Sequence, residues 1–194
     1  MKTPLIILAA ALPLSACISF GAKPPPSLMT LTAAAAVPVG QDQNSKAAKS
    51  ITIAIPAVPQ SLATARVPVQ TTPTTIAYVK NALWAEPPAR LFARLLSDTV
   101  TTRVGRVVLS PAQSLSDPGA RLGGELRTFG LDSSASQAVV TFDASLIRVD
   151  ASTVEKRRFE ARVPVSAIDA TTAATALNDA ANQVAVQVAD WVGR

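Results

Sequence analysis

The sequence predicts an α/β domain in which two main helices cover a mixed, partly antiparallel sheet of about five strands. Residues 137–149 and 155–165 alternate apolar with polar side chains, as antiparallel strands do when one face is buried and the other is wet. Residues 87–100 and 171–192 instead repeat apolar side chains every three or four positions, which is the period of an amphipathic helix. A chain of 194 residues suits one such domain and a tether.

Short strands open the domain, which we expect to span residues 49–194. The first strand begins just after Lys49, where three isoleucines alternate with smaller residues: Ile51, Ile53 and Ile55. This alternation predicts a strand that ends before Pro56. Residues 66–70 and 75–79 are rich in β-branched side chains and predict two more short strands.

The first helix follows the sequence Trp84-Ala85-Glu86-Pro87-Pro88. We expect Glu86 to cap it, because a carboxylate is favourable at a helix N-terminus. Pro87 lies at or near the first helical position, where its missing N–H costs nothing. Gly105 lies just past the helix end, and residues 107–109 predict a strand that the helix returns parallel to an earlier one.

The second half predicts a meander followed by a long helix. Residues 122–131, 137–149 and 155–165 are successive strand candidates joined by short segments rich in turn formers. Asp169 or Thr171 can cap the last helix, which ends at Gly193 and has one apolar face: Ala173, Leu177, Ala181, Val184, Val188 and Trp191. Packing on the sheet explains this face, and a partner-binding helix would have the same pattern.

Residues 1–16 have the organisation of a bacterial signal peptide: a positive charge at Lys2, a short apolar run and small residues. The sequence Leu14-Ser15-Ala16-Cys17 matches the bacterial lipobox, which predicts cleavage between Ala16 and Cys17. The Cys17 thiol would carry diacylglycerol and its freed amine a further acyl chain, and two or three chains make a stable anchor. The alternatives are an ordinary secretory signal, and a cytoplasmic protein with an apolar N-terminus.

Residues 17–48 predict a lipidated N-terminus and a flexible tether. Pro24-Pro25-Pro26 forms a stiff spacer, and residues 28–32 are a candidate short strand. Ile18 follows the cysteine, where aspartate would favour retention in the inner membrane. We therefore expect an outer-membrane lipoprotein that faces the periplasm, with the inner membrane as the alternative.

Composition argues against an enzyme. The chain has no histidine and one cysteine, so a Ser-His-Asp triad and metal sites built on histidine or cysteine are excluded. Gly123-Gly124 lies in a predicted strand and indicates a bulge or a close backbone approach rather than a phosphate loop. The run Lys156-Arg157-Arg158 predicts a solvated strand face instead of a nucleic-acid site, and a weak attraction to anionic lipid headgroups stays open.

Residues 76–88, residues 122–129 and the terminal Ala-rich helix that ends in Trp191 resemble the ABC-type transport auxiliary lipoproteins. The sharpest motif contains Trp84, Glu86, Pro87 and Pro88. The chain departs from the family at Met29-Thr30-Leu31, where a Tyr-x-Leu strand is common.

This resemblance implies an anticodon-binding-like fold and a non-enzymatic role beside an MCE-domain protein with its ABC permease and ATPase, which move phospholipids or other apolar molecules between the two membranes. It implies no cofactor beyond the lipid on Cys17, and a possible homo-oligomer, since some members form rings. Two alternatives remain: a lipid carrier that holds an acyl chain between sheet and helices, and another envelope lipoprotein for lipopolysaccharide assembly or cell-wall synthesis. The Trp84 motif is either a corner of the core or part of a docking edge.

Overall fold

The fold consists of one sheet and two main helices. The structure is a computed structural model that describes residues 27–46, 48–149 and 151–194; the predicted signal peptide, the Ala16–Cys17 cleavage site and the Pro24–Pro26 spacer lie outside these ranges. The described sheet has seven strands: β1 (Ser50–Ile53), β2 (Arg66–Thr72), β3 (Thr75–Leu83), β4 (Val107–Leu109), β5 (Ala120–Asp132), β6 (Gln137–Ile147) and β7 (Glu155–Pro164). The helices are α1 (Pro88–Val104) and α2 (Ala170–Val192), and short 3-10 turns form at Gln60–Leu62 and Gln113–Leu115.

The predicted α/β class with two main helices is confirmed, although the sheet has seven strands instead of about five. Strand β5 joins two pairs of strands into one sheet: β1 with β4 on one side, and β2 with β3 on the other. It pairs parallel with β1 near its start and with β2 near its end, and it pairs antiparallel with β6 along its length. The predicted meander of β5, β6 and β7 is confirmed, and β4 lies parallel to β1 as expected.

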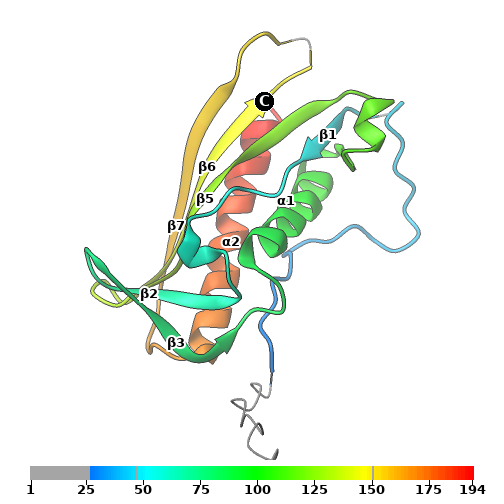
Figure 1. Cartoon of the computed structure of the whole chain (residues 1–194). Coiled ribbons are helices and arrows are strands. Elements are labelled where there is room, and N and C mark those ends of the chain that lie inside the picture. The colour runs from blue at the N-terminus through cyan, green and yellow to red at the C-terminus, as the bar shows by residue number, and fades with distance from the viewer. Residues whose placement is uncertain (1–26, 47, 150) are drawn as a thin grey trace, which may run out of the picture.

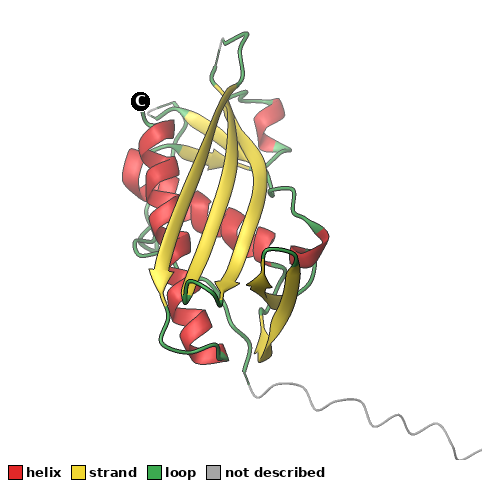
Figure 2. Cartoon of the chain, turned by 90° about the vertical axis from the view of Figure 1, so that its left-hand side faces the viewer, coloured by secondary structure: helices red, strands yellow, loops and turns green. Residues whose placement is uncertain are grey.

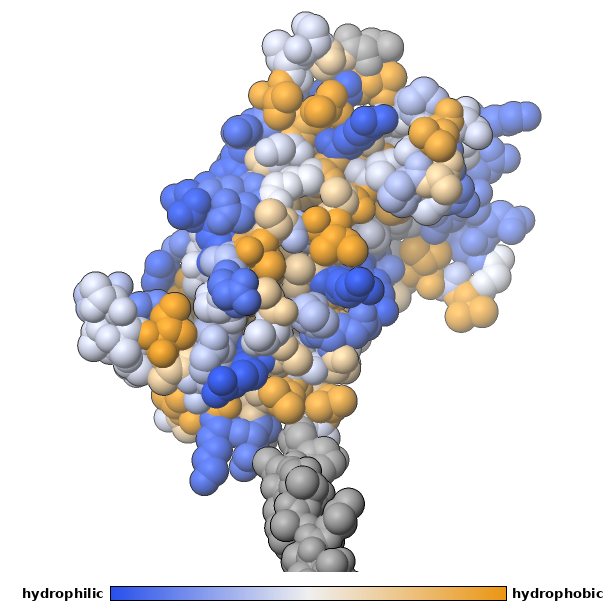
Figure 3. Space-filling view, in the orientation of Figure 1, coloured by the Kyte–Doolittle hydropathy of each residue, from blue (hydrophilic) through white to orange (hydrophobic). Residues whose placement is uncertain are grey.

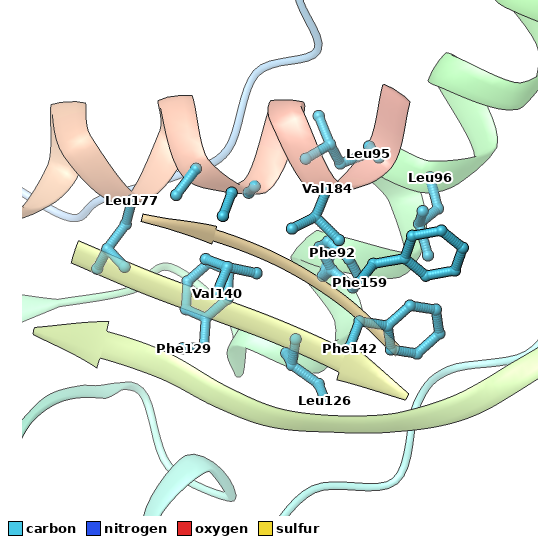
Figure 4. Close-up of a cluster of buried hydrophobic side chains, with 14 of the residues drawn as sticks. Phe92, Leu95, Leu96, Leu126, Phe129, Val140, Phe142, Phe159, Leu177 and Val184 are labelled. Atoms are coloured by element: carbon cyan, nitrogen blue, oxygen red, sulfur yellow. The ribbon is translucent and has the colours of Figure 1, made fainter. Parts of the chain in front are cut away.

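The core lies between one face of the sheet and the two helices, and Figures 1 and 2 show both helices on the same side of the long strands. Figure 4 shows Leu177 and Val184 of α2 pointing towards the strands and the aromatic side chains between them. Phe92 packs edge-on against Phe129 and Phe142, with ring centroids 6.5 and 5.3 Å apart. The predicted inner face of β6 is fully buried: Ala138, Val140, Phe142, Ala144 and Leu146.

The ends of α1 correct one prediction. Glu86 does not cap this helix, because its carboxylate pairs with Arg94, which lies two turns into the helix. Pro87 is the N-cap residue without a side-chain bond, and Pro88 occupies the first turn. Two successive prolines leave fewer unsatisfied N–H groups there, so the helix start depends less on a capping side chain. Gly105 ends α1 in the left-handed conformation, with φ 64°.

Helix α2 begins as predicted at one of the two candidate caps. Asp169 is the N-cap residue, and its carboxylate accepts a hydrogen bond of 2.8 Å from the backbone N–H of Thr172. This bond holds the pKa of Asp169 below its usual value. In the described part of the chain, no helix is long and apolar enough to cross a membrane.

Candidate anchoring and docking site

The predicted Trp84 motif is a corner where three segments meet: the end of β3, the chain at Ala65 just before β2, and the start of the described chain. Trp84 is almost wholly buried and packs edge-on against Phe129, with ring centroids 5.4 Å apart. Its backbone N–H donates to the carbonyl of Ala65 over 2.8 Å. Pro88 is buried beneath the same corner, whereas Pro87 is exposed and Glu86 is half-buried. The structure therefore brings Trp84 and Pro88 into the core and leaves Glu86 and Pro87 at the surface.

The third segment at this corner is the start of the described chain. Met29 lies alongside Trp84 as a parallel bridge. Its N–H donates to the Leu83 carbonyl, and its own carbonyl accepts from the N–H of Ala85, each over 2.8 Å. The candidate short strand at residues 28–32 therefore extends the sheet by one bridge at the end of β3. We call residues 28–34 the strap.

Two asparagines of α2 hold the other half of the strap. The Asn178 Oδ1 accepts from the N–H of Thr32 over 2.9 Å, and the Asn182 Oδ1 accepts from the N–H of Ala34 over 2.8 Å. The Asn182 Nδ2 also donates to the carbonyls of Thr32 and Asn178 over 3.0 and 2.9 Å. Asn178 and Asn182 share a helix face because they are four residues apart. We call this pair the asparagine clasp.

Sequence reasoning missed the clasp, because it assigned no role to Asn178 and Asn182. The available signal was the spacing itself: two amide side chains four residues apart, on a helix otherwise rich in alanine. An amide offers one donor and one acceptor group, which matches an extended backbone strand. The clasp binds the main chain of the strap, so it constrains the path of residues 28–34 more than their identity.

The outer face of the meander is not covered by a helix (Figure 2), and it has charged side chains. Asp143 accepts two bonds from Arg158, of 2.6 and 2.7 Å, and Arg127 approaches it at 3.5 Å. The Arg158 bonds hold the pKa of the Asp143 carboxyl below its usual value. Lys156, Arg157 and Arg158 are all exposed, which confirms the predicted solvated strand face. This face is an ion-pair network with extra positive charge rather than a preformed acid–base pair.

The glycine pair in β5 explains a hollow in this face. Gly124 has φ +144°, and a Cβ at this position would collide with the Asp143 carbonyl. The predicted close backbone approach is therefore confirmed at Gly124. The hollow above it is lined by Glu125, Asp143, Ser145 and Lys156, among others. In the described ranges no three potential metal ligands cluster, there or elsewhere.

These features define a class of protein: an α/β domain with its N-terminal segment fixed against one end. The identity follows from a family model that matches residues 30–189, and the chain belongs to the family of ABC-type transport auxiliary lipoprotein components. A lipoprotein component of this kind belongs to the cell envelope. A search among curated proteins found no match.

Two solved structures share the fold. A crystal structure of a Xanthomonas campestris protein, assigned to family DUF330, has a TM-score of 0.69 at 20% sequence identity and covers 86% of this chain and 94% of that one. A crystal structure of an uncharacterised protein has a TM-score of 0.64 at 18% identity, covering 75% of this chain and 93% of that one. At these identities the likeness concerns the fold alone.

Proposed function

We propose that this protein is a non-enzymatic lipoprotein, anchored through Cys17 to the periplasmic face of the outer membrane, that docks an MCE-type lipid transport assembly. The strap is the observation that carries the proposal. It is bonded to the sheet at Met29 and to α2 through the asparagine clasp. A tether fixed at two places gives the anchored domain a defined direction of attachment, which an adaptor between a membrane and a protein assembly requires.

Family membership supports the adaptor role over the other envelope lipoproteins, because the family is described as an auxiliary component of ABC-type transport. The packing gives no support to a lipid carrier. Buried side chains lie between the sheet and the helices (Figure 4), and Phe92, Phe129, Leu177 and Val184 have no exposed surface. An acyl chain in this layer would have to displace packed side chains.

The anchor is tested by intact mass spectrometry of the protein purified from membranes. We expect a mature chain that begins at Cys17 and carries a diacylglyceryl thioether and an N-acyl chain. Cys17→Ser should lose the added mass and leave the membrane fraction. A mature N-terminus elsewhere, without lipid, would refute the anchor.

Docking is tested first by gene neighbourhood, where adjacent genes for a permease, an ATPase and an MCE-domain protein favour the proposal and their absence weakens it. The second test is co-purification from solubilised envelopes. The native form should retain an MCE-domain partner, and a secreted Cys17→Ser form should bind the same partner when added back. Failure of both forms to retain any MCE-domain protein would refute the docking role.

A further inference from the structure

Three exposed aliphatic side chains lie together at the tip of the β6–β7 hairpin. The last paired residues of the two strands are Leu146 and Glu155, and Ile147 and Val154 are the next residues towards the tip. Their exposed fractions are 40% and 54%, and Val149 is 50% exposed. Figure 3 shows apolar side chains at this end of the molecule beside hydrophilic ones. Exposed branched aliphatics grouped in this way indicate a contact surface.

The base of the tip is held in place. Arg148 donates to Glu155 over 2.6 Å, and it also donates to the carbonyls of Trp191, Val192 and Arg194 at the end of α2, over 2.9 to 3.2 Å. The guanidinium therefore ties the hairpin to the helix. The aliphatic side chains of the tip are presented by a fixed element.

Positive charge borders the tip. Arg121 pairs with Ile147 across the sheet, and Lys156 lies two residues beyond Val154. Both are exposed, and neither forms an ion pair with a residue that the structure describes. Residues 147–158 contain four cationic side chains and two carboxylates. Aliphatic side chains bordered by lysine and arginine have the chemistry of segments that bind an anionic bilayer surface.

We propose that this hairpin tip, formed by Ile147, Val149 and Val154 with Arg121 and Lys156, is a second membrane contact that binds anionic phospholipid headgroups. A lipid surface fits better than a protein because the tip is narrow. A stable protein interface buries about 800 Å² on each partner, far more than three aliphatic side chains supply, whereas a weak second contact suffices for a protein that is already anchored.

The geometry allows both contacts on one bilayer. The tip and the described start of the chain lie at opposite ends of the molecule (Figures 1 and 2). The roughly ten residues between Cys17 and the described chain reach about 35 Å when extended. The domain can therefore lie along the membrane, with the outer sheet face towards the lipid and the helices towards the periplasm. This arrangement rests on the anchor of the proposed function, but not on the docking partner.

Vesicle co-sedimentation of the secreted Cys17→Ser protein tests the tip without the lipid anchor. We expect binding to vesicles of phosphatidylethanolamine with phosphatidylglycerol, and little binding to phosphatidylcholine alone. Val149→Asp combined with Val154→Asp should lower binding about tenfold, because it replaces aliphatic contacts with negative charge. Lys156→Gln should lower it about fivefold, and added salt should weaken it. Ile76→Asp is the matched control, since Ile76 is 46% exposed on β3, which lies away from the tip (Figure 1).

The outcomes separate the possible occupants. Binding that the tip variants abolish and Ile76→Asp leaves intact supports the membrane contact. No vesicle binding, or binding insensitive to the tip variants, overturns it. A photo-cross-linker at position 149 that captures a protein or a second copy of the chain, without vesicle binding, overturns it in favour of that occupant. The vesicle assay contains no MCE-domain protein, so failure here leaves the docking test unaffected, and failure of docking leaves this one unaffected.

Discussion

Individual side-chain amides set the path of the strap. Asn182 makes three of the contacts at the clasp: it accepts from Ala34 and donates to the carbonyls of Thr32 and Asn178. Each is exposed or only partly buried, so each contributes modestly to folding stability. Their combined effect is local, because they hold a segment that has few buried side chains of its own.

Asn182→Ala should release the strap without unfolding the domain. Hydrogen exchange at the Ala34 amide should accelerate about tenfold, and the global free energy of unfolding should fall by only about 0.5–1.5 kcal/mol. Alanine has the highest helix propensity, so a weakened α2 would not explain the change. Amide exchange followed by NMR or mass spectrometry measures the first quantity, and urea unfolding measures the second.

Gln183→Ala is the control for this variant, because Gln183 lies next along the same helix and is exposed. It should leave exchange at Thr32 and Ala34 unchanged. Unaltered protection of the strap in an Asn178→Ala, Asn182→Ala double variant would show that the bridge at Met29 holds the segment alone.

At the scale of elements, two arginine side chains bond to the C-terminal end of α2: Arg106, which precedes β4, and Arg148, which follows β6. The last carbonyls of a helix have no partner within it. Here Arg148 donates to two of them, those of Trp191 and Val192, and to the Arg194 carbonyl beyond the helix; Arg106 also donates to the Val192 carbonyl over 3.3 Å. Burial, and then the neighbouring Arg148, lower the pKa of Arg106. Two like charges at one helix end are tolerated because they face carbonyl groups and the Glu155 carboxylate.

Arg148→Ala should destabilise both the hairpin and the end of α2. Loss of the charge-assisted bonds should lower the free energy of unfolding by about 1–3 kcal/mol and speed amide exchange near residues 189–194. Arg148→Lys should recover only part of this, since an ammonium group cannot reproduce the planar fork of a guanidinium. Urea unfolding with amide exchange provides the measurement. Arg121→Ala, at an exposed arginine of the same sheet, should change stability by about 0.5 kcal/mol or less.

Periodicity and composition were enough to locate the seven strand segments and both helices, because most of them bury one face and the spacing of apolar residues records it. It could not show that β5 joins β1 and β2 into one sheet, since pairing between distant strands leaves no local pattern. The Glu86 cap was wrong because the competing partner, Arg94, lies two turns away. The clasp was missed because it binds backbone groups of the strap. Any sequence in residues 28–34 offers such groups, so no side chain there indicates the contact.

On the scale of the whole molecule, charge is arranged in pairs on the surface. Arginine bonds lower the pKa of Asp143, Glu155 and Asp190, and local hydrogen bonds lower the pKa of Asp132 and Asp169. Burial alone would raise the pKa of Glu160, but hydrogen bonds from Arg162 and Thr141 outweigh it and lower this pKa as well. Burial in α1 raises the pKa of Asp98. The chain contains no histidine, so no side chain of the usual neutral-range type titrates between about pH 6 and 8.

Stability should therefore be flat near neutrality and fall in acid. A carboxyl with a lowered folded pKa contributes stability above its unfolded pKa, and this is lost as the pH falls through the folded value. Asp98 acts in the opposite direction, but it is one group against six. We expect the urea midpoint to stay constant from about pH 6 to 8 and to drop below about pH 4.

Asp143→Asn separates this linkage from general acid unfolding. The variant keeps the shape of the side chain but cannot be ionised, so it should be less stable than the parent at pH 7, where the parent carboxylate is charged and bonded to Arg158. Below the folded pKa the parent carboxyl is neutral as well, so the two urea midpoints should converge as the solution is acidified. Midpoint curves that run parallel from pH 7 into acid would show that the Asp143–Arg158 pair contributes nothing to stability. A midpoint that changes between pH 6 and 8 in both proteins would reveal a titrating group outside the carboxyl network.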